Sequence, residues 1–186
     1  YMKDVVETPF KNEKSDTGHC TAVGAVVYQI VPNAKLIYMN FNRSNRETRT
    51  NMIDWIIEHK DKIDVINVSL SFSSLQVKDY FTRLETLNIP LTSSSGNESD
   101  VENGIGYPAK YEWCIAVGAS SVDNNGVTYY SDGGKQLDCV APPNTKMLND
   151  EGKIFSLSGT SFSSPFVAGS LALYSSWKRK NGLGKI

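Results

Sequence analysis

The chain has 186 residues, of which 40% are hydrophobic, and its formal net charge is −1. That length suits one domain with a sizeable core, so residues 1–186 are expected to form a single domain. A near-neutral charge without a long basic run argues against nucleic acid or an anionic membrane as a partner. No apolar run approaches the roughly 18 residues of a membrane span, and no signal-peptide pattern follows Tyr1.

The first half of the chain alternates between helical and strand patterns. Residues 1–18 are polar and contain no predicted strand. The small apolar residues over 18–30 predict a buried helix with His19 at its very start. The elements expected next are a strand over 35–41, a helix over 47–59, a strand over 64–70, a helix over 75–87 and a strand over 90–95.

The second half begins with a polar loop over 97–107. The elements expected after it are a strand over 114–119, a hairpin turn at 123–126, strands near 137–140 and 153–157, and a helix from Ser161 to about Trp177. Strands that alternate with helices of this length are typical of βα units. The sequence therefore predicts an α/β fold with a mostly parallel central sheet flanked by helices.

The cysteines and histidines do not indicate a bound metal. Three cysteines are too few and oddly numbered for a disulfide framework, and the two histidines, His19 and His59, fit no zinc spacing. Cys20, next to His19, would suit a thiol nucleophile, but a small buried apolar residue is the favoured interpretation for Cys20, Cys114 and Cys139. His59 lies among helix charges and is expected on the solvated surface. No cofactor is predicted, and a calcium site cannot be read from the sequence.

The segment Gly159-Thr160-Ser161 precedes the last apolar run. A proline is tolerated only in the first turn of a helix, so Pro165 predicts that this helix begins at or just before Ser161. The unpaired N–H groups and the dipole at a helix N-terminus stabilise negative charge there. Ser161 is therefore a candidate nucleophile, although a serine that simply caps a helix has the same local pattern.

Two further polar residues fall where strands end or helices begin. His19 opens the first helix, and Asn97 follows the strand at 90–95. Active groups of α/β proteins collect at the carboxyl ends of the strands, and serine, histidine and an amide suit acyl transfer. Singly, a helix-start histidine bonded to backbone and a turn asparagine would explain His19 and Asn97 equally well.

Together these segments resemble a known family, the subtilisin-like serine peptidases or subtilases. The resemblance covers nearly the whole chain and rests on His19-Cys-Thr-Ala-Val23, Asp64-Val-Ile-Asn-Val-Ser-Leu70, Ser95-Gly-Asn-Glu98, Gly106-Tyr-Pro108, Cys114-Ile-Ala-Val-Gly-Ala119, Val140-Ala-Pro142 and Gly159-Thr-Ser-Phe-Ser-Ser-Pro-Phe-Val-Ala-Gly169. It implies a three-layer subtilisin-like fold, a serine endopeptidase acting on peptides or proteins, and a cis peptide bond between Tyr107 and Pro108. The family also favours a secreted or cell-surface location.

The resemblance also implies roles for individual residues. Ser161 would attack the scissile carbonyl, His19 would act as general base, and Asn97 would bind the oxyanion. The residues implied to bind substrate are Ser69, Leu70, Ser71, Ser94, Ser95, Gly96, Glu98 and Gly106. An extended substrate would pair with the backbone near 69–71 and 93–95, and Glu98 at the S1 pocket would favour a basic or polar P1 residue.

The catalytic aspartate of the family has no convincing match. It should end an early strand well before His19, but Asp16-Thr17-Gly18 abuts His19, and Asp4 lacks the Ser/Thr-Gly that should follow. We therefore expect the first strand or strands, with the aspartate, to be missing from this chain. Three alternatives stay open: the segment was cut away, it lies on another polypeptide such as a propeptide or an N-terminal fragment, or it was never there. Without that carboxylate, weak or no activity is expected of this chain.

Two smaller departures keep a non-catalytic alternative open. Cys20 replaces a glycine beside His19, and Ser71 stands where the cleft strand of the family has glycine. The alternative is a module of the same fold that binds a peptide or propeptide without cleaving it. A nucleotide-binding α/β domain fits poorly, because Gly104-Ile-Gly106 does not follow a strand and Gln136 follows Gly134-Lys135.

Overall fold

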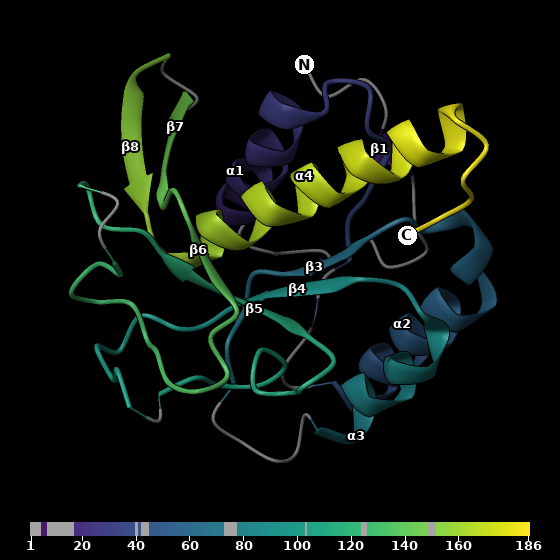
Figure 1. Cartoon of the computed structure of the whole chain (residues 1–186), viewed down its shortest axis with the longest axis horizontal. Coiled ribbons are helices and arrows are strands. Elements are labelled where there is room, and N and C mark those ends of the chain that lie inside the picture. Colours follow the sequence, from purple (N-terminus) through teal and green to yellow (C-terminus); the bar gives the residue numbers. More distant parts are fainter. Residues whose placement is uncertain are drawn as a thin grey trace.

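The structure, a computed structural model, describes residues 5–6, 17–39, 41, 45–72, 78–102, 104–123, 126–148 and 152–186 (Figure 1). Within these residues the α-helices are α1 (Thr17–Ile30), α2 (Arg46–Glu58), α3 (Lys78–Phe81) and α4 (Thr160–Lys180). Two 3₁₀ helices, η1 (Lys60–Lys62) and η3 (Thr82–Leu87), follow α2 and α3.

The central sheet has four parallel strands in the order β3-β4-β5-β6. Their bounds are Ile66–Val68, Leu91–Ser94, Ile115–Ala119 and Cys139–Ala141. A separate parallel pair joins β1 (Val5–Val6) to β2 (Leu36–Ile37), and an antiparallel pair joins β7 (Asn144–Leu148) to β8 (Ile154–Ser158). The β7–β8 hairpin extends away from the sheet (Figure 1). The prediction of a mostly parallel α/β fold is confirmed.

Helices cover both faces of the central sheet. Successive side chains of a strand point to opposite faces of the sheet, so adjacent residues of β4 contact the elements on its two faces. Thr92 accepts a hydrogen bond from Ser164 of α4, with 3.2 Å between their hydroxyl oxygens. Leu91 instead packs in an apolar cluster with Ile53 of α2 and Leu84 of η3. The molecule therefore has three layers, with α4 on one face and α2, α3 and η3 on the other.

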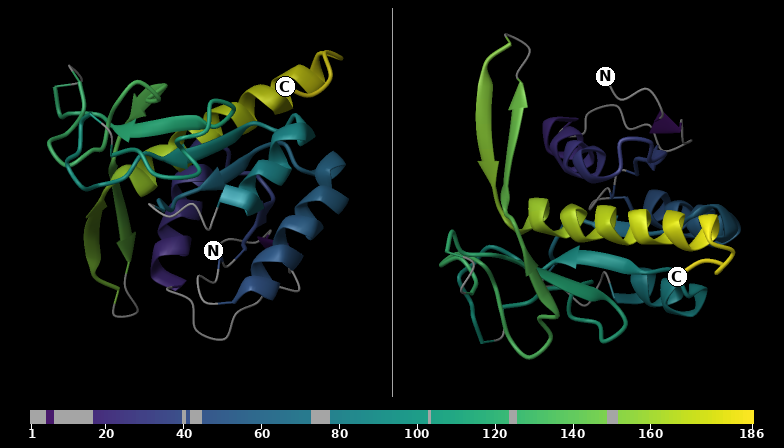
Figure 2. Two further views of the ribbon diagram at one scale, coloured as in Figure 1. Left: turned by 90° about the horizontal axis from the view of Figure 1, so that it is seen from below. Right: turned by 45° about the horizontal axis from the view of Figure 1, so that its top comes forward.

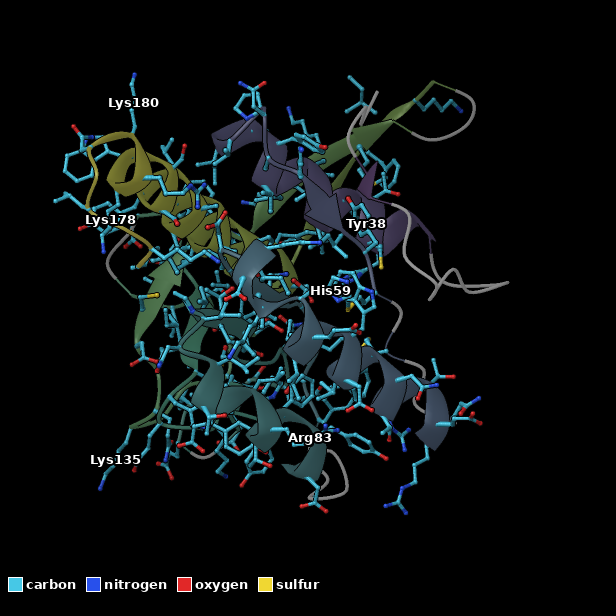
Figure 3. All side chains as sticks on the ribbon, turned by 90° about the vertical axis from the view of Figure 1, so that its right-hand side faces the viewer. Tyr38, His59, Arg83, Lys135, Lys178 and Lys180 are labelled. Atoms are coloured by element: carbon cyan, nitrogen blue, oxygen red, sulfur yellow. The ribbon has the colours of Figure 1, made fainter. Side chains whose placement is uncertain are left out.

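Helix α1 lies beside α4 on the same side of the sheet (Figure 2). The two helices approach closely at Gly169, where a Cβ atom would stand 3.0 Å from Cδ1 of Ile30. A second close approach joins α1 to the segment after β2, where Tyr38 lies (Figure 3). A Cβ at Gly24 of α1 would overlap the Tyr38 hydroxyl. Burial raises the pKa of Tyr38 to about 12, and the nearby Tyr28 and Cys20 add to this shift. These contacts fix α1, and therefore His19, relative to α4.

Several elements differ from the sequence prediction. Strand β1 was not expected, because two consecutive valines in a polar segment give no periodicity and are stabilised only by pairing with β2. Strand β7 was also missed, since it follows two prolines and begins with polar residues. The helix predicted over 75–87 is α3 followed by η3, with 75–77 outside the described residues. The His59 side chain is only partly solvated, at 26% exposed, because its ring stacks on Trp55 with 4.0 Å between the ring centroids.

The Tyr107–Pro108 peptide bond is cis, as predicted. None of the helices in the described ranges has the length and apolar character needed to cross a membrane.

Candidate active site

Ser161 is the second residue of α4, directly after the turn that starts the helix. Gly159, the N-cap, has φ 150° and ψ 160°, a combination that is open essentially only to glycine. Its N–H donates to the carbonyl of Pro143, and its carbonyl accepts the N–H of Phe162. The helix begins at Thr160, so the prediction of a start at or just before Ser161 is confirmed. The positive end of a 21-residue helix therefore lies at Ser161.

Ser69, just after β3, holds the backbone of Ser161. Its hydroxyl donates to the Ser161 carbonyl at 2.7 Å, and Oγ of Ser161 lies 3.4 Å from the Ser69 carbonyl oxygen. Asn67 supports this contact, because its Nδ2 donates to the Ser69 hydroxyl at 3.0 Å. Its Oδ1 in turn accepts the hydroxyls of Ser164, at 2.7 Å, and of Thr92, at 3.1 Å. A chain of hydrogen bonds thus ties β3 and β4 to the first turn of α4.

Asn97 follows β4 and faces the same helix start. Its Oδ1 accepts both the N–H of Thr160, at 3.0 Å, and the hydroxyl of Thr160, at 3.1 Å. A backbone N–H can only donate, so these contacts fix which end of the amide faces α4. In the described part of the chain Nδ2 of Asn97 has no acceptor within hydrogen-bond distance, and it is left to donate to a ligand.

His19 lies in the first turn of α1 and is half-buried. Its ring is 5.7 Å from the ring of Phe162, the neighbour of Ser161, at a tilt of 50°. The packing of α1 on α4 therefore brings the imidazole to the start of α4, although 142 residues separate it from Ser161 in the chain (161 − 19).

One cavity of about 1430 Å³ joins these residues. His19, Asn97 and Ser161 all line it, as do the predicted substrate-binding residues Ser69, Leu70, Ser71, Ser94, Gly96, Glu98 and Gly106. The cavity also runs between β2 and β3, where Leu36 and Ile37 line one side and Ile66 and Val68 line the other.

Ser95 is the exception among the predicted substrate-binding residues. It is fully buried and does not line the cavity. Its N–H donates to the Val117 carbonyl and its carbonyl accepts the N–H of Gly106, so its backbone is occupied within the protein. The expected pairing of substrate with this residue is corrected accordingly, because Ser95 can support the cavity wall but has no free backbone group there.

Ser71 reaches across the cavity wall to Gly106. A Cβ at Gly106 would lie 2.2 Å from the Ser71 hydroxyl oxygen, so the glycine leaves room for that side chain. The Ser71 hydroxyl thus lies against the neighbouring segment, which pairs with this one through Phe72 and Tyr107. The side chain that replaces the expected glycine makes this part of the cavity more polar and narrower.

Asp132 is a cavity-lining residue that the sequence did not indicate. It is 1% exposed, and it lines the cavity beside Gly96 and Glu98. Its carboxylate Oδ1 accepts the N–H groups of Glu98 and Asp100, each at 2.9 Å. The pKa of Asp132 is raised, mainly by burial and also by the charges of Glu98 and Asp100, although these two hydrogen bonds lower it. The only sequence signal was an acidic residue in a turn-rich segment, where aspartate is common.

Neither a metal nor a disulfide is evident among the described residues. Cys20, Cys114 and Cys139 form no disulfide within the described residues, and only Cys114 is fully buried, which raises its pKa. No group of three or more His, Cys, Asp and Glu side chains within the described ranges has the arrangement of a metal site. The expected burial is therefore confirmed for Cys114, whereas Cys20 and Cys139 are only half-buried.

Sequence comparisons point to one family. The model described as "Subtilase family" matches residues 3–183. Subtilisin DY of Bacillus licheniformis is 33% identical over 156 residues, which cover 79% of this chain and 56% of that protein. The Major intracellular serine protease of Bacillus subtilis (strain 168) is 28% identical over 163 residues, covering 82% of this chain and 50% of that protein. The chain thus spans about half the length of these relatives. Because one of them is named as intracellular, the expected secretion stays a prediction.

Solved structures give the same fold. The prenylagaramide maturation protease PagA superposes with a TM-score of 0.76 at 22% identity, covering 96% of this chain and 70% of that one. A mutant of the protease domain of PatA superposes with a TM-score of 0.77 at 19% identity, covering 98% and 75%. The subtilisin-like fold and the resemblance seen in the sequence are confirmed, and the chain belongs to the subtilase family.

Proposed function

We propose that the protein is a serine endopeptidase of the subtilisin type, with Ser161 as nucleophile, His19 as general base and Asn97 in the oxyanion hole. The observation that supports this most is the orientation of the Asn97 amide. Thr160 holds Oδ1, which leaves Nδ2 to donate within the cavity that Ser161 also lines, near the start of α4. A donor already oriented in the free protein stabilises an oxyanion without reorganisation.

The proposed reaction proceeds through an acyl-enzyme. Oγ of Ser161 gives its proton to His19 and forms a bond to the scissile carbonyl carbon. Asn97 Nδ2 and the N–H of Ser161 hold the resulting oxyanion. His19 then gives the proton to the leaving amine as the C–N bond breaks, and water repeats the sequence to release the acid. The Ser161 hydroxyl, 3.4 Å from the Ser69 carbonyl oxygen in the free protein, would rotate toward His19 to begin.

An extended peptide substrate would run along residues 69–71. These residues continue from the end of β3 and line the cavity. Backbone pairing there would place the P1 side chain toward Gly96, Glu98 and Gly106. Ser94 would then form part of the wall and not of a pairing strand, and Ser95, which is buried outside the cavity lining, would not meet the substrate.

The carboxylate that orients His19 is proposed to arrive on an extended segment between β2 and β3. Within the described residues β2 pairs only with β1, and β3 pairs only with β4, so each presents an unpaired edge to the cavity. Apolar residues of α1 and α4, including Val23, Val27 and Ala172, line the floor of this part of the cavity. A parallel strand seated there would end beside His19.

Hydrogen exchange of the full encoded protein tests this segment. The Ile66 N–H donates to the Pro90 carbonyl beside β4, so the next amide of β3, that of Asn67, points to the opposite edge. If a strand is seated between β2 and β3, the Asn67 amide should be strongly protected. Fast exchange of this edge-facing amide, in a protein that is otherwise protected, would contradict the proposal.

A non-catalytic module that binds a peptide or propeptide is the second candidate. It is favoured by the Ser71 hydroxyl, which lies against Gly106 within the cavity. Hydrolysis of a quenched fluorescent peptide library by the full encoded protein separates the two candidates. We expect cleavage that is abolished by Ser161→Ala. In Asn97→Ala, kcat should fall by about 10²- to 10³-fold, the figure known for the corresponding asparagine of a subtilisin. Peptide binding without any cleavage would support the module instead.

A further inference from the structure

Asp132 packs behind the end of β4 at one end of the cavity. It belongs to the segment between β5 and β6, and its N–H donates to the Gly96 carbonyl at 3.1 Å. The side chain is 1% exposed, yet it lines the cavity together with Gly96, Glu98, Gly104 and Gly106. We call these five residues the acidic end of the cavity.

The two carboxylate oxygens of Asp132 have different surroundings. Oδ1 accepts two backbone N–H groups, from Glu98 and Asp100. Oδ2 has no hydrogen-bond donor among the described residues, and no Lys, Arg or His of those residues forms an ion pair with it. A buried carboxylate with an unused oxygen gains strongly from a cationic donor, because little solvent competes for it.

Two glycines bring this carboxylate to the cavity wall. A Cβ at Gly96 would lie 2.0 Å from Oδ2, and a Cβ at Gly104 would lie 2.9 Å from Cγ of Asp132. Any larger residue at either position would displace the carboxylate. Gly96 also has φ 126°, a conformation that side chains rarely adopt. The glycines thus leave room for Oδ2 at the surface of the acidic end.

The charge around Asp132 is also unfavourable in the absence of a cation. Glu98 and Asp100 lie close enough to add to the rise in its pKa that burial causes. A ligand cation would offset this repulsion and the loss of hydration together.

We propose that Asp132 is the specificity-determining residue of this site and that the acidic end of the cavity binds the arginine or lysine side chain of a P1 residue. The proposal rests on the proposed peptidase function, because P1 is defined by the bond that Ser161 attacks. The P1 cation would lie against Oδ2, with the Ser71 hydroxyl at the adjacent wall. Glu98 is exposed and Asp132 is buried, so the contribution of Glu98 is weakened by solvent and salt whereas that of Asp132 is not.

Peptides that differ only at P1 test this proposal on the full encoded protein. Arginine, its neutral isostere citrulline, and phenylalanine are compared at P1. We expect kcat/KM for arginine to exceed that for citrulline by about 10- to 100-fold, the range of one hydrogen bond to a charged group. In Asp132→Asn, which keeps an acceptor for Glu98 and Asp100, the arginine-to-citrulline ratio should fall toward one.

Asp138→Asn is the matched control. The Asp138 carboxylate also accepts a backbone N–H, from Ala116 at 2.8 Å, but it does not line the cavity. This variant should keep the wild-type ratio. A wild-type preference for phenylalanine, or a ratio that Asp132→Asn leaves unaltered, would overturn the proposal.

Benzamidine binding gives a readout that does not need catalysis. The wild type should bind this amidinium cation about 10- to 100-fold more tightly than Asp132→Asn. If benzamidine shows this difference but no peptide is cleaved, the cation site stands and the proposed peptidase function fails. If peptides are cleaved but both proteins bind benzamidine equally, the peptidase function stands and the role of Asp132 fails.

Discussion

The hydroxyl of Ser69 donates to the carbonyl of Ser161 at 2.7 Å. That carbonyl lies four residues before Pro165, which has no N–H and cannot make the usual helical hydrogen bond to it. Ser69 thus supplies a donor where the sequence of α4 removes one. The same contact fixes the backbone of the proposed nucleophile to the end of β3.

Ser69→Ala should destabilise the protein by about 1–3 kcal/mol, because it leaves a partly buried carbonyl without this donor. Urea unfolding measures the change. Ser170→Ala is the matched control, since the Ser170 hydroxyl also donates to a carbonyl of α4, that of Phe166 at 3.0 Å, but on an exposed face. The control should change stability by less than about 0.5 kcal/mol. Equal losses in the two variants would contradict the special role of Ser69.

Gly159→Ala should destabilise the protein by about 1–3 kcal/mol, because the N-cap residue has φ 150° and ψ 160°. Shifting this residue would also move Thr160 away from Asn97, so any peptidase activity should fall together with stability. Gly126→Ala provides the comparison, since a Cβ there meets nothing within 4 Å and φ is not in the left-handed region. A loss for Gly126→Ala as large as that for Gly159→Ala would show that the N-cap geometry is not the cause.

Gly169→Ala should separate α1 from α4 and cost about 1–3 kcal/mol by overpacking against Ile30. Ile30→Val removes the Cδ1 atom that lies 3.0 Å from the added methyl, and alone it should cost about 0.5–1.5 kcal/mol. The double variant should lose less stability than the sum of the two single variants. Simple additivity would mean that the helices do not meet at this point.

The stability contributed by Asp132 should depend on pH. Burial raises its pKa above 3.8, with smaller contributions from Glu98 and Asp100, so the folded protein favours the protonated form. A carboxyl group whose pKa is higher in the folded than in the unfolded protein contributes stability that is fully present below its unfolded-state pKa. That stability is lost as pH rises through its folded-state pKa. The stability of Asp132→Asn relative to the wild type should therefore increase as pH rises from the unfolded-state pKa of Asp132 to its folded-state pKa. Chemical unfolding of both proteins across that range measures the difference, and a gap that shrinks with rising pH would contradict the assignment.

The sequence predicted those parts of the candidate site whose positions depend on a local sequence pattern. Pro165 placed the start of α4 correctly, because a proline restricts a helix whatever surrounds it. The positions of His19 and Asn97 at element boundaries were also accessible from the chain order. Strand β1 was not, since two valines become a strand only through pairing with β2, some 30 residues away (36 − 6).

The acidic end of the cavity could not be predicted from the sequence, and Asp132 shows why. The sequence pointed to Glu98, which follows the Gly-Asn segment directly. Asp132 lies 34 residues further along, and its importance comes from burial and from the absence of side chains at Gly96 and Gly104. Both properties depend on the tertiary structure, so no local sequence pattern predicts them.

The most direct test of the account is covalent labelling of the full encoded protein with a fluorophosphonate, followed by peptide mapping. The account predicts one adduct, on Ser161, because among the serines of the described ranges only this one combines the helix N-terminus with His19 and the Asn97 amide. Ser163 and Ser164, which are fully buried in the same helix, should stay unmodified, and heat-denatured protein should not react. His19→Ala should slow the reaction by several orders of magnitude. Absence of an adduct on the folded protein, or an adduct on another serine, would contradict the assignment of Ser161 as the nucleophile.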